Sequence, residues 1–127
     1  MALNNKTYFF IAILWTCFVS TLSLITISPE IGKSFVFDLN DKYVHFAFFY
    51  VFVIVWFWFL IKTKFAKNAK NIALITAILY GIIIEICQGA FTTLRNPDVY
   101  DVIANTLGAL TGIIIIKLTY KNSKTTH

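Results

Sequence analysis

The stretch 85-EICQGAFTTLRNPDVYDVIANTLGALTG-112 joins two strongly apolar segments through a short polar connection. Glu85 lies near the end of the first segment, and Asp101 and Asn105 lie at the start of the second. A helix needs about 20 apolar residues to cross the roughly 30 Å hydrocarbon core of a bilayer. The two segments that flank the connection approach that length, so the stretch indicates two membrane helices that meet at one membrane surface.

The composition of the whole chain supports the same class. Of its 127 residues, 58% are hydrophobic and only 13% are charged, and a soluble domain of this size buries too little of its surface to hide so many apolar side chains. Four apolar runs are long enough to span a membrane. We therefore predict an all-α fold, an integral membrane bundle of four transmembrane helices in a single domain, 1–127. The predicted helices are approximately 8–27, 43–61, 71–89 and 101–118.

The first run is expected to remain in the protein as a membrane helix. A secretory signal peptide has a positively charged start, a shorter apolar region and a cleavage site of small residues. Here the start carries only Lys6, the apolar run is longer, and no such cleavage site follows it.

The lysines predict how the bundle is oriented. The connection 62–70 carries four lysines and no acid, and the tail carries three more after the last apolar run begins to end. The connections 28–42 and 90–101 are mixed in charge. Because Lys and Arg in short loops stay cytoplasmic, we expect both termini inside and the two mixed connections outside. The net charge of +5 then reflects topology and contact with anionic membrane lipids, and it does not indicate a nucleic-acid partner.

Polar residues from three predicted helices fall at one depth. With a rise of 1.5 Å per residue, His45, Glu85 and Asn105 lie on the order of 5–8 Å below the outer rim. Ionisable groups at membrane depth face the bundle interior and find partners there. We therefore predict an outward-facing polar cluster. Its residues are Asp41, Lys42, His45, Glu85, Gln88, Arg95, Asp98, Asp101 and Asn105.

Two further contacts follow from this arrangement. Arg95 keeps its proton, so we expect it to be the counter-charge of the buried Glu85. Gly108 and Gly112 form a G-x-x-x-G that lets another helix approach closely. We expect the last helix to pack there against the second or third, which would bring Asn105 against Glu85 or His45. The alternative for the glycines is a homodimer contact.

The same residues resemble the VanZ-like membrane proteins. The resemblance extends over residues from roughly 8 to 118, and it rests on D-K-x-x-H-F at the start of one membrane helix, E-x-x-Q at the end of the next, and R-x-x-D-x-x-D-x-x-x-N-x-x-G leading into the last. These motifs are Asp41, Lys42, His45 and Phe46; Glu85 and Gln88; and Arg95, Asp98, Asp101, Asn105 and Gly108. The family takes its name from a protein associated with low-level resistance to the glycopeptide teicoplanin. The resemblance implies a multi-pass protein of the bacterial cytoplasmic membrane with a link to the cell envelope, and it supplies no reaction.

Several functions remain open for the polar cluster. The leading hypothesis is that it binds a lipid-linked or phosphate-bearing envelope component, with Arg95 and Lys42 as phosphate contacts. A small membrane enzyme that acts on a lipid headgroup by metal-assisted or acid–base chemistry is the alternative. A small transporter is disfavoured because the polar groups gather at one surface. The pattern identifies no cofactor.

Two other interpretations concern single residues. The nitrogen and oxygen donors of the cluster include metal-ligand types, with Asp41, His45 and Glu85 as candidates, joined by Asp98 and Asp101, although no spacing motif assigns a metal. The structural alternative is that Asp41 and Asp101 cap helices and that the remaining polar residues only fix helix register.

Overall fold

The computed structural model describes the backbone of residues 4–24, 37–91 and 98–125. Side chains are described for residues 4–24, 42–90 and 98–120. Within these ranges the chain is helical, with no strand. The helices are α1 (Asn5–Leu24), α3 (Phe37–Leu60), the short 3₁₀ helix η1 (Ala66–Asn68), α4 (Ala69–Phe91) and α5 (Val99–Thr125).

The four long helices form a membrane bundle, as the sequence predicts. Each contains a segment long and apolar enough to cross a bilayer. Each also begins before its predicted start, and α5 continues past residue 118 to Thr125. The predicted ranges followed apolar residues alone, whereas a helix can continue into water through polar residues once its hydrogen-bonded turns are established.

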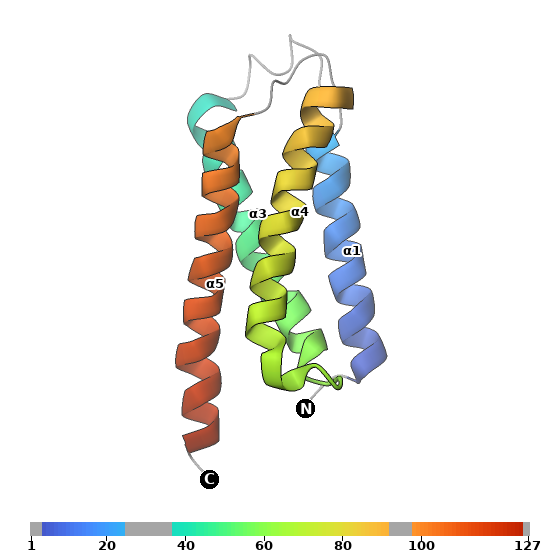
Figure 1. The fold of residues 1–127 in the computed structure, drawn as a ribbon, viewed down its shortest axis with the longest axis vertical. Coiled ribbons are helices and arrows are strands. Elements are labelled where there is room, and N and C mark those ends of the chain that lie inside the picture. The colour runs from blue at the N-terminus through green and yellow to red at the C-terminus, as the bar shows by residue number, and fades with distance from the viewer. Residues whose placement is uncertain (1–3, 25–36, 92–97, 126–127) are drawn as a thin grey trace.

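Neighbouring helices run in opposite directions (Figure 1). In that view α4 lies in front of α3, with α5 on one side and α1 on the other. Both chain ends lie at the same end of the bundle as the short connection between α3 and α4. Helix α3 is central to the packing, because it contacts α1, α4 and α5.

Helices α3 and α5 approach most closely at two glycines. A Cβ on Gly108 would collide with the backbone carbonyl of Phe46, and one on Gly112 would collide with the side chain of Val53. Both glycines therefore face α3 within the chain, and the contact brings the two backbones together. The homodimer alternative would require this same glycine face, which α3 already covers.

Helix α1 is joined to the other helices mainly by polar side chains. The indole N–H of Trp15 donates to the Phe48 carbonyl at 2.9 Å, and that of Trp56 donates to Thr16 Oγ1 at 3.0 Å. Tyr80 of α4 donates to the Thr16 carbonyl at 3.1 Å. Only three residues of α1 are buried, so most of its surface is left to face lipid.

The core follows the inner faces of the helices. Phe49, Phe52 and Phe57 of α3 are among the largest fully buried side chains, and alanines of α4 and α5 pack against them. Large apolar side chains elsewhere are exposed, including Leu14, Ile83 and Leu118. In a membrane these outer faces contact lipid, which explains how so apolar a chain can leave them uncovered.

Candidate functional site

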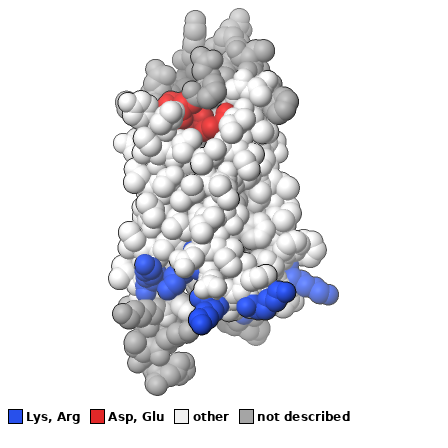
Figure 2. Space-filling view, in the orientation of Figure 1, with Lys and Arg blue, Asp and Glu red and all other residues white. Residues whose placement is uncertain are grey.

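The described charges separate along the bundle. Glu85, Asp98 and Asp101 gather at one end, which we call the acidic end, where α3 begins, α4 ends and α5 begins. Most of the described lysines form a band at the other end, which we call the lysine end (Figure 2). The two ends are more than a membrane span apart, so their side chains do not neutralise one another.

Asp98 begins α5 and ties it to α3. Its Oδ1 accepts the backbone N–H of Tyr100 at 2.9 Å, so it caps the helix. Its Oδ2 accepts a hydrogen bond from the Lys42 ammonium at 2.5 Å. The Lys42 bond, followed by the Tyr100 N–H, holds the pKa of Asp98 below its usual range. The capping role considered for Asp101 is thus wrong, because Asp98 occupies the cap and Asp101 lies inside the first turn.

Lys42 also bonds Asp101. The ammonium donates to Asp101 Oδ1, so one cation on α3 bridges two carboxylates of α5. The sequence argument assigned Lys42 to a phosphate and gave the counter-charge role to Arg95. Arg95 lies outside the described residues, and its pairing with Glu85 stays a prediction. A signal for Lys42 was present in its spacing, since it precedes His45 by one helical turn.

Glu85 is buried where α4 reaches the start of α5. Its Oε2 accepts the backbone N–H of Asp98 at 3.0 Å. Its Oε1 is buried and has no hydrogen-bond partner among the residues that the structure describes. A buried carboxylate oxygen in this condition is costly, because it has lost water without gaining a donor.

His45 lies between Asn105 and Asp101, and all three are buried. Its Nδ1 is 3.0 Å from Asn105 Oδ1, and its Nε2 is 3.6 Å from Asp101 Oδ2. An amide oxygen only accepts, so Nδ1 carries the proton and the neutral ring directs the lone pair of Nε2 toward the carboxylate. The amide group thus fixes both the tautomer and the ring orientation.

Asn105 also has a nitrogen directed away from His45. Its Nδ2 is buried and finds no partner in the described part of the chain. Gly81 leaves room for this amide, since a Cβ on Gly81 would lie 3.1 Å from Nδ2. The polar cluster therefore contains one unsatisfied donor and, at Glu85 Oε1, one unsatisfied acceptor.

Gln88 and Asp41 do not contribute described contacts to this cluster. Gln88 Nε2 donates to the Ser23 carbonyl at 2.8 Å and so ties α4 to α1. Ser23 was not singled out from the sequence, because a backbone carbonyl leaves no residue-type signal. Asp41 lies in the first turns of α3, but its side chain is outside the described residues.

Three buried side chains can supply ligands to one metal ion. His45 of α3, Glu85 of α4 and Asp101 of α5 each offer one donor atom, and these atoms lie within 4.8 Å of one another. One imidazole nitrogen with two carboxylate oxygens is a donor set for Zn²⁺ or Mn²⁺, and the carboxylates also suit Mg²⁺. Of the three candidates from the sequence, His45 and Glu85 belong to this set.

The four spans and the buried cluster beneath one end define a polytopic membrane protein with a polar site near one membrane surface. The chain belongs to the VanZ/LLP1 family, whose sequence profile matches residues 2–120.

One curated relative is a protein of Schizosaccharomyces pombe named "Uncharacterized protein C11E3.10". It is 26% identical over 83 residues, which cover 65% of this chain and 50% of the relative. The matched part thus spans about half the length of that relative. No solved structure matches the chain significantly.

Proposed function

We propose that this chain binds a phosphate-bearing, lipid-linked component of the cell envelope through a divalent cation held by His45, Glu85 and Asp101. The observation that carries the proposal is the convergence of their donor atoms, from three helices, within 4.8 Å of one another. The partnerless Glu85 Oε1 supports it, because a bound cation would satisfy that oxygen.

The local charge favours a cation over direct contact with phosphate. Three described carboxylates face a single ammonium, that of Lys42, which bonds Asp98 and Asp101. A phosphate placed directly among these groups would be repelled. A divalent cation would balance the excess negative charge and then attract the phosphate oxygens.

The donor geometry leaves room for such a ligand. Lys42 bonds Asp101 Oδ1, while Oδ2 is directed toward His45 Nε2. Mg²⁺ and Mn²⁺ accept about six ligands, so three protein donors would leave positions for water and phosphate oxygens. The Asn105 amide stands behind the imidazole, as an orienting group does behind a metal-bound histidine.

The position of the site supports a lipid headgroup as the ligand. His45, Glu85 and Asp101 lie near the ends of their membrane spans, where headgroup phosphates meet the hydrocarbon core. We infer that the acidic end faces outward, because the lysine band at the other end favours the cytoplasmic side. The resemblance to a protein linked to teicoplanin resistance supports a bacterial envelope component.

Manganese binding tests the cation. The purified full chain in detergent should reduce the electron paramagnetic resonance signal of free Mn²⁺. Glu85→Gln and Asp101→Asn should each weaken binding roughly tenfold or more, because each removes a ligand. Asp98→Asn is the matched control, since it removes the same charge nearby and should retain most of the affinity. Equal losses in all three variants would indicate general electrostatics, and no binding by the wild type would refute the site.

A lipid measurement tests the ligand. An isoprenoid phosphate should associate with the protein in the presence of Mn²⁺ and be released by a chelator, whereas the matching isoprenoid alcohol should not associate. Equal retention of both lipids would overturn phosphate recognition. Release of inorganic phosphate in the same sample would replace the binding function with the enzymatic alternative.

A further inference from the structure

A second pocket lies at the lysine end, remote from the acidic cluster. It has a volume of about 420 Å³ and is lined by Phe57, Ile61, Ala66, Lys67, Lys70 and Tyr120. That volume lies within the range of about 300–1,000 Å³ typical of small-ligand sites. The lining residues come from the end of α3, the region around η1 and α4, and the end of the membrane span in α5.

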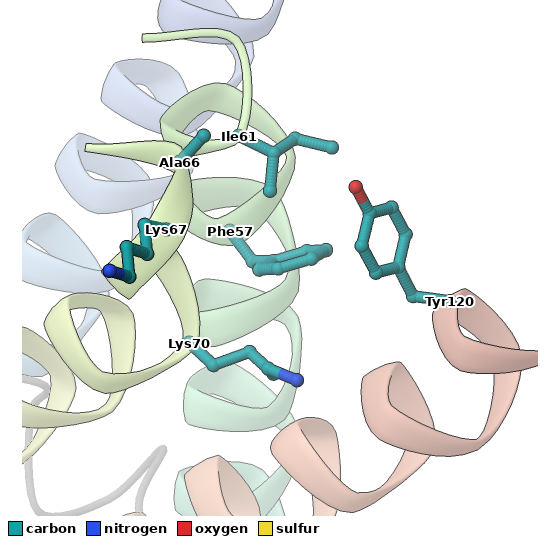
Figure 3. A pocket seen from close by; sticks show the side chains of 6 residues that line it. All are labelled: Phe57, Ile61, Ala66, Lys67, Lys70 and Tyr120. Carbon is teal, nitrogen blue, oxygen red and sulfur yellow. The ribbon is translucent and has the colours of Figure 1, made fainter. Parts of the chain in front are cut away.

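The pocket has an apolar floor and a polar rim (Figure 3). The Phe57 ring lies at its centre, with Ile61 above it in this view. The Lys70 side chain extends toward α5, and the Tyr120 hydroxyl is directed toward Ile61. Lys67 lies on the outer side of the same rim. The pocket therefore offers a cation and a hydroxyl next to an apolar surface.

The charges around this pocket are uncompensated among the described residues. No described carboxylate forms an ion pair with Lys67 or Lys70, because the described acids gather at the acidic end. By contrast, Lys62 lies 5.4 Å from the centre of the Tyr8 ring and Lys64 lies 5.3 Å from that of Phe65. Those two lysines share the lysine end but do not line the pocket.

We propose that this pocket binds the headgroup of an anionic phospholipid. The phosphate would contact Lys67 and Lys70, and the adjoining part of the lipid would lie against Phe57 and Ile61. Charge complementarity supports this occupant, as does the depth of the pocket, since its residues stand where the spans of α3, α4 and α5 end. Basic pockets between membrane helices are suited to phospholipid headgroups. This site requires neither a metal nor the acidic cluster.

Native mass spectrometry of the full chain tests the proposal. Phosphatidylglycerol and phosphatidylcholine are added separately, with a chelator present throughout so that the acidic-end site cannot contribute. The wild type should retain phosphatidylglycerol preferentially. Lys67→Gln with Lys70→Gln should reduce that retention roughly tenfold and leave phosphatidylcholine unchanged. The matched control, Lys62→Gln with Lys64→Gln, removes equal charge and should retain the preference.

Further arms keep the result decisive. Lys67→Arg with Lys70→Arg should preserve binding if positive charge in the pocket is what matters, and all variants are compared by thermal unfolding in detergent. Equal losses in the two glutamine pairs would overturn the pocket in favour of a diffuse charge effect. Glycerol phosphate that binds as tightly as the lipid would reassign the pocket to a free phosphate. Since the chelator is present, failure of this proposal and failure of the cation site are distinguishable.

Discussion

Asn105 controls the chemistry of His45 without needing to touch a ligand. Its amide oxygen lies 3.0 Å from His45 Nδ1, and this contact fixes which ring nitrogen is protonated. The neighbouring helix makes room for the amide through Gly81. A single buried side chain therefore sets the orientation of the proposed metal ligand.

We expect Asn105→Ala to weaken Mn²⁺ binding by roughly 10–100-fold, because the ring loses the group that orients it while all three donors remain. The measurement is the resonance titration described for the cation site. Thr111→Ala is the control, since that hydroxyl bonds only the Leu107 carbonyl of its own helix. Unchanged affinity in Asn105→Ala would mean that the amide does not position the imidazole.

Lys42 and Asp101 should be energetically coupled. Asp101 is largely buried while Lys42 is partly exposed, so removing the ammonium leaves a buried carboxylate short of a partner. A double-mutant cycle of Lys42→Met and Asp101→Asn, read by denaturation in detergent, should give an interaction energy of roughly 0.5–3 kcal/mol. If the separate losses simply add, the bridge between α3 and α5 contributes nothing to stability.

At the scale of helices, the glycine positions differ in what surrounds them. Gly108 faces the backbone carbonyl of Phe46, which cannot turn aside, whereas Gly112 faces the Val53 side chain. Gly81 has slightly more room beside Asn105 and Phe49. The tolerance for an added methyl group should therefore differ in this order.

We expect Gly108→Ala to destabilise the bundle most, by about 3 kcal/mol, Gly112→Ala less, and Gly81→Ala least. Overpacking costs about 1–3 kcal/mol, while alanine returns up to about 1 kcal/mol of helix propensity, so the balance is decided by the space available. Unfolding in a denaturing detergent series measures the ranking, and Ile114→Ala on the exposed face of α5 is the control. Equal effects at all three glycines would contradict the described packing of α3 and α5.

The helices themselves were predictable from sequence, but the side-chain partners were not. Apolar runs identify membrane spans because each span must satisfy its own backbone hydrogen bonds. The depth of His45, Glu85 and Asn105 follows from helical rise alone. The destination of Gln88 at the Ser23 carbonyl depends on how each helix is rotated and tilted, which spacing along the chain does not determine. For the same reason Lys42 was not recognised as the bridge to Asp101.

For the whole molecule, the separation of charge should determine its direction in the membrane. In a background with Cys17→Ala and Cys87→Ala, a cysteine introduced at Lys67 should react only with a membrane-permeant reagent in intact cells. A cysteine introduced at Thr93 should react with an impermeant reagent, because cationic loops remain cytoplasmic. The reverse labelling pattern would place the acidic cluster inside and overturn its proposed link to an outer envelope component.

The attachment of α1 has a consequence for the order of assembly. Helices α3, α4 and α5 share the glycine contact and most of the buried core, whereas α1 is held mainly through hydrogen bonds such as that of Trp56 to Thr16. Three helices should therefore form an autonomous insertion unit onto which the first docks late. Residues 31–127 expressed as a separate chain should remain monodisperse and recapture a co-expressed 1–30 fragment. Trp56→Phe with Tyr80→Phe should abolish recapture while leaving the larger fragment intact, and aggregation of that fragment alone would show that assembly is concerted instead.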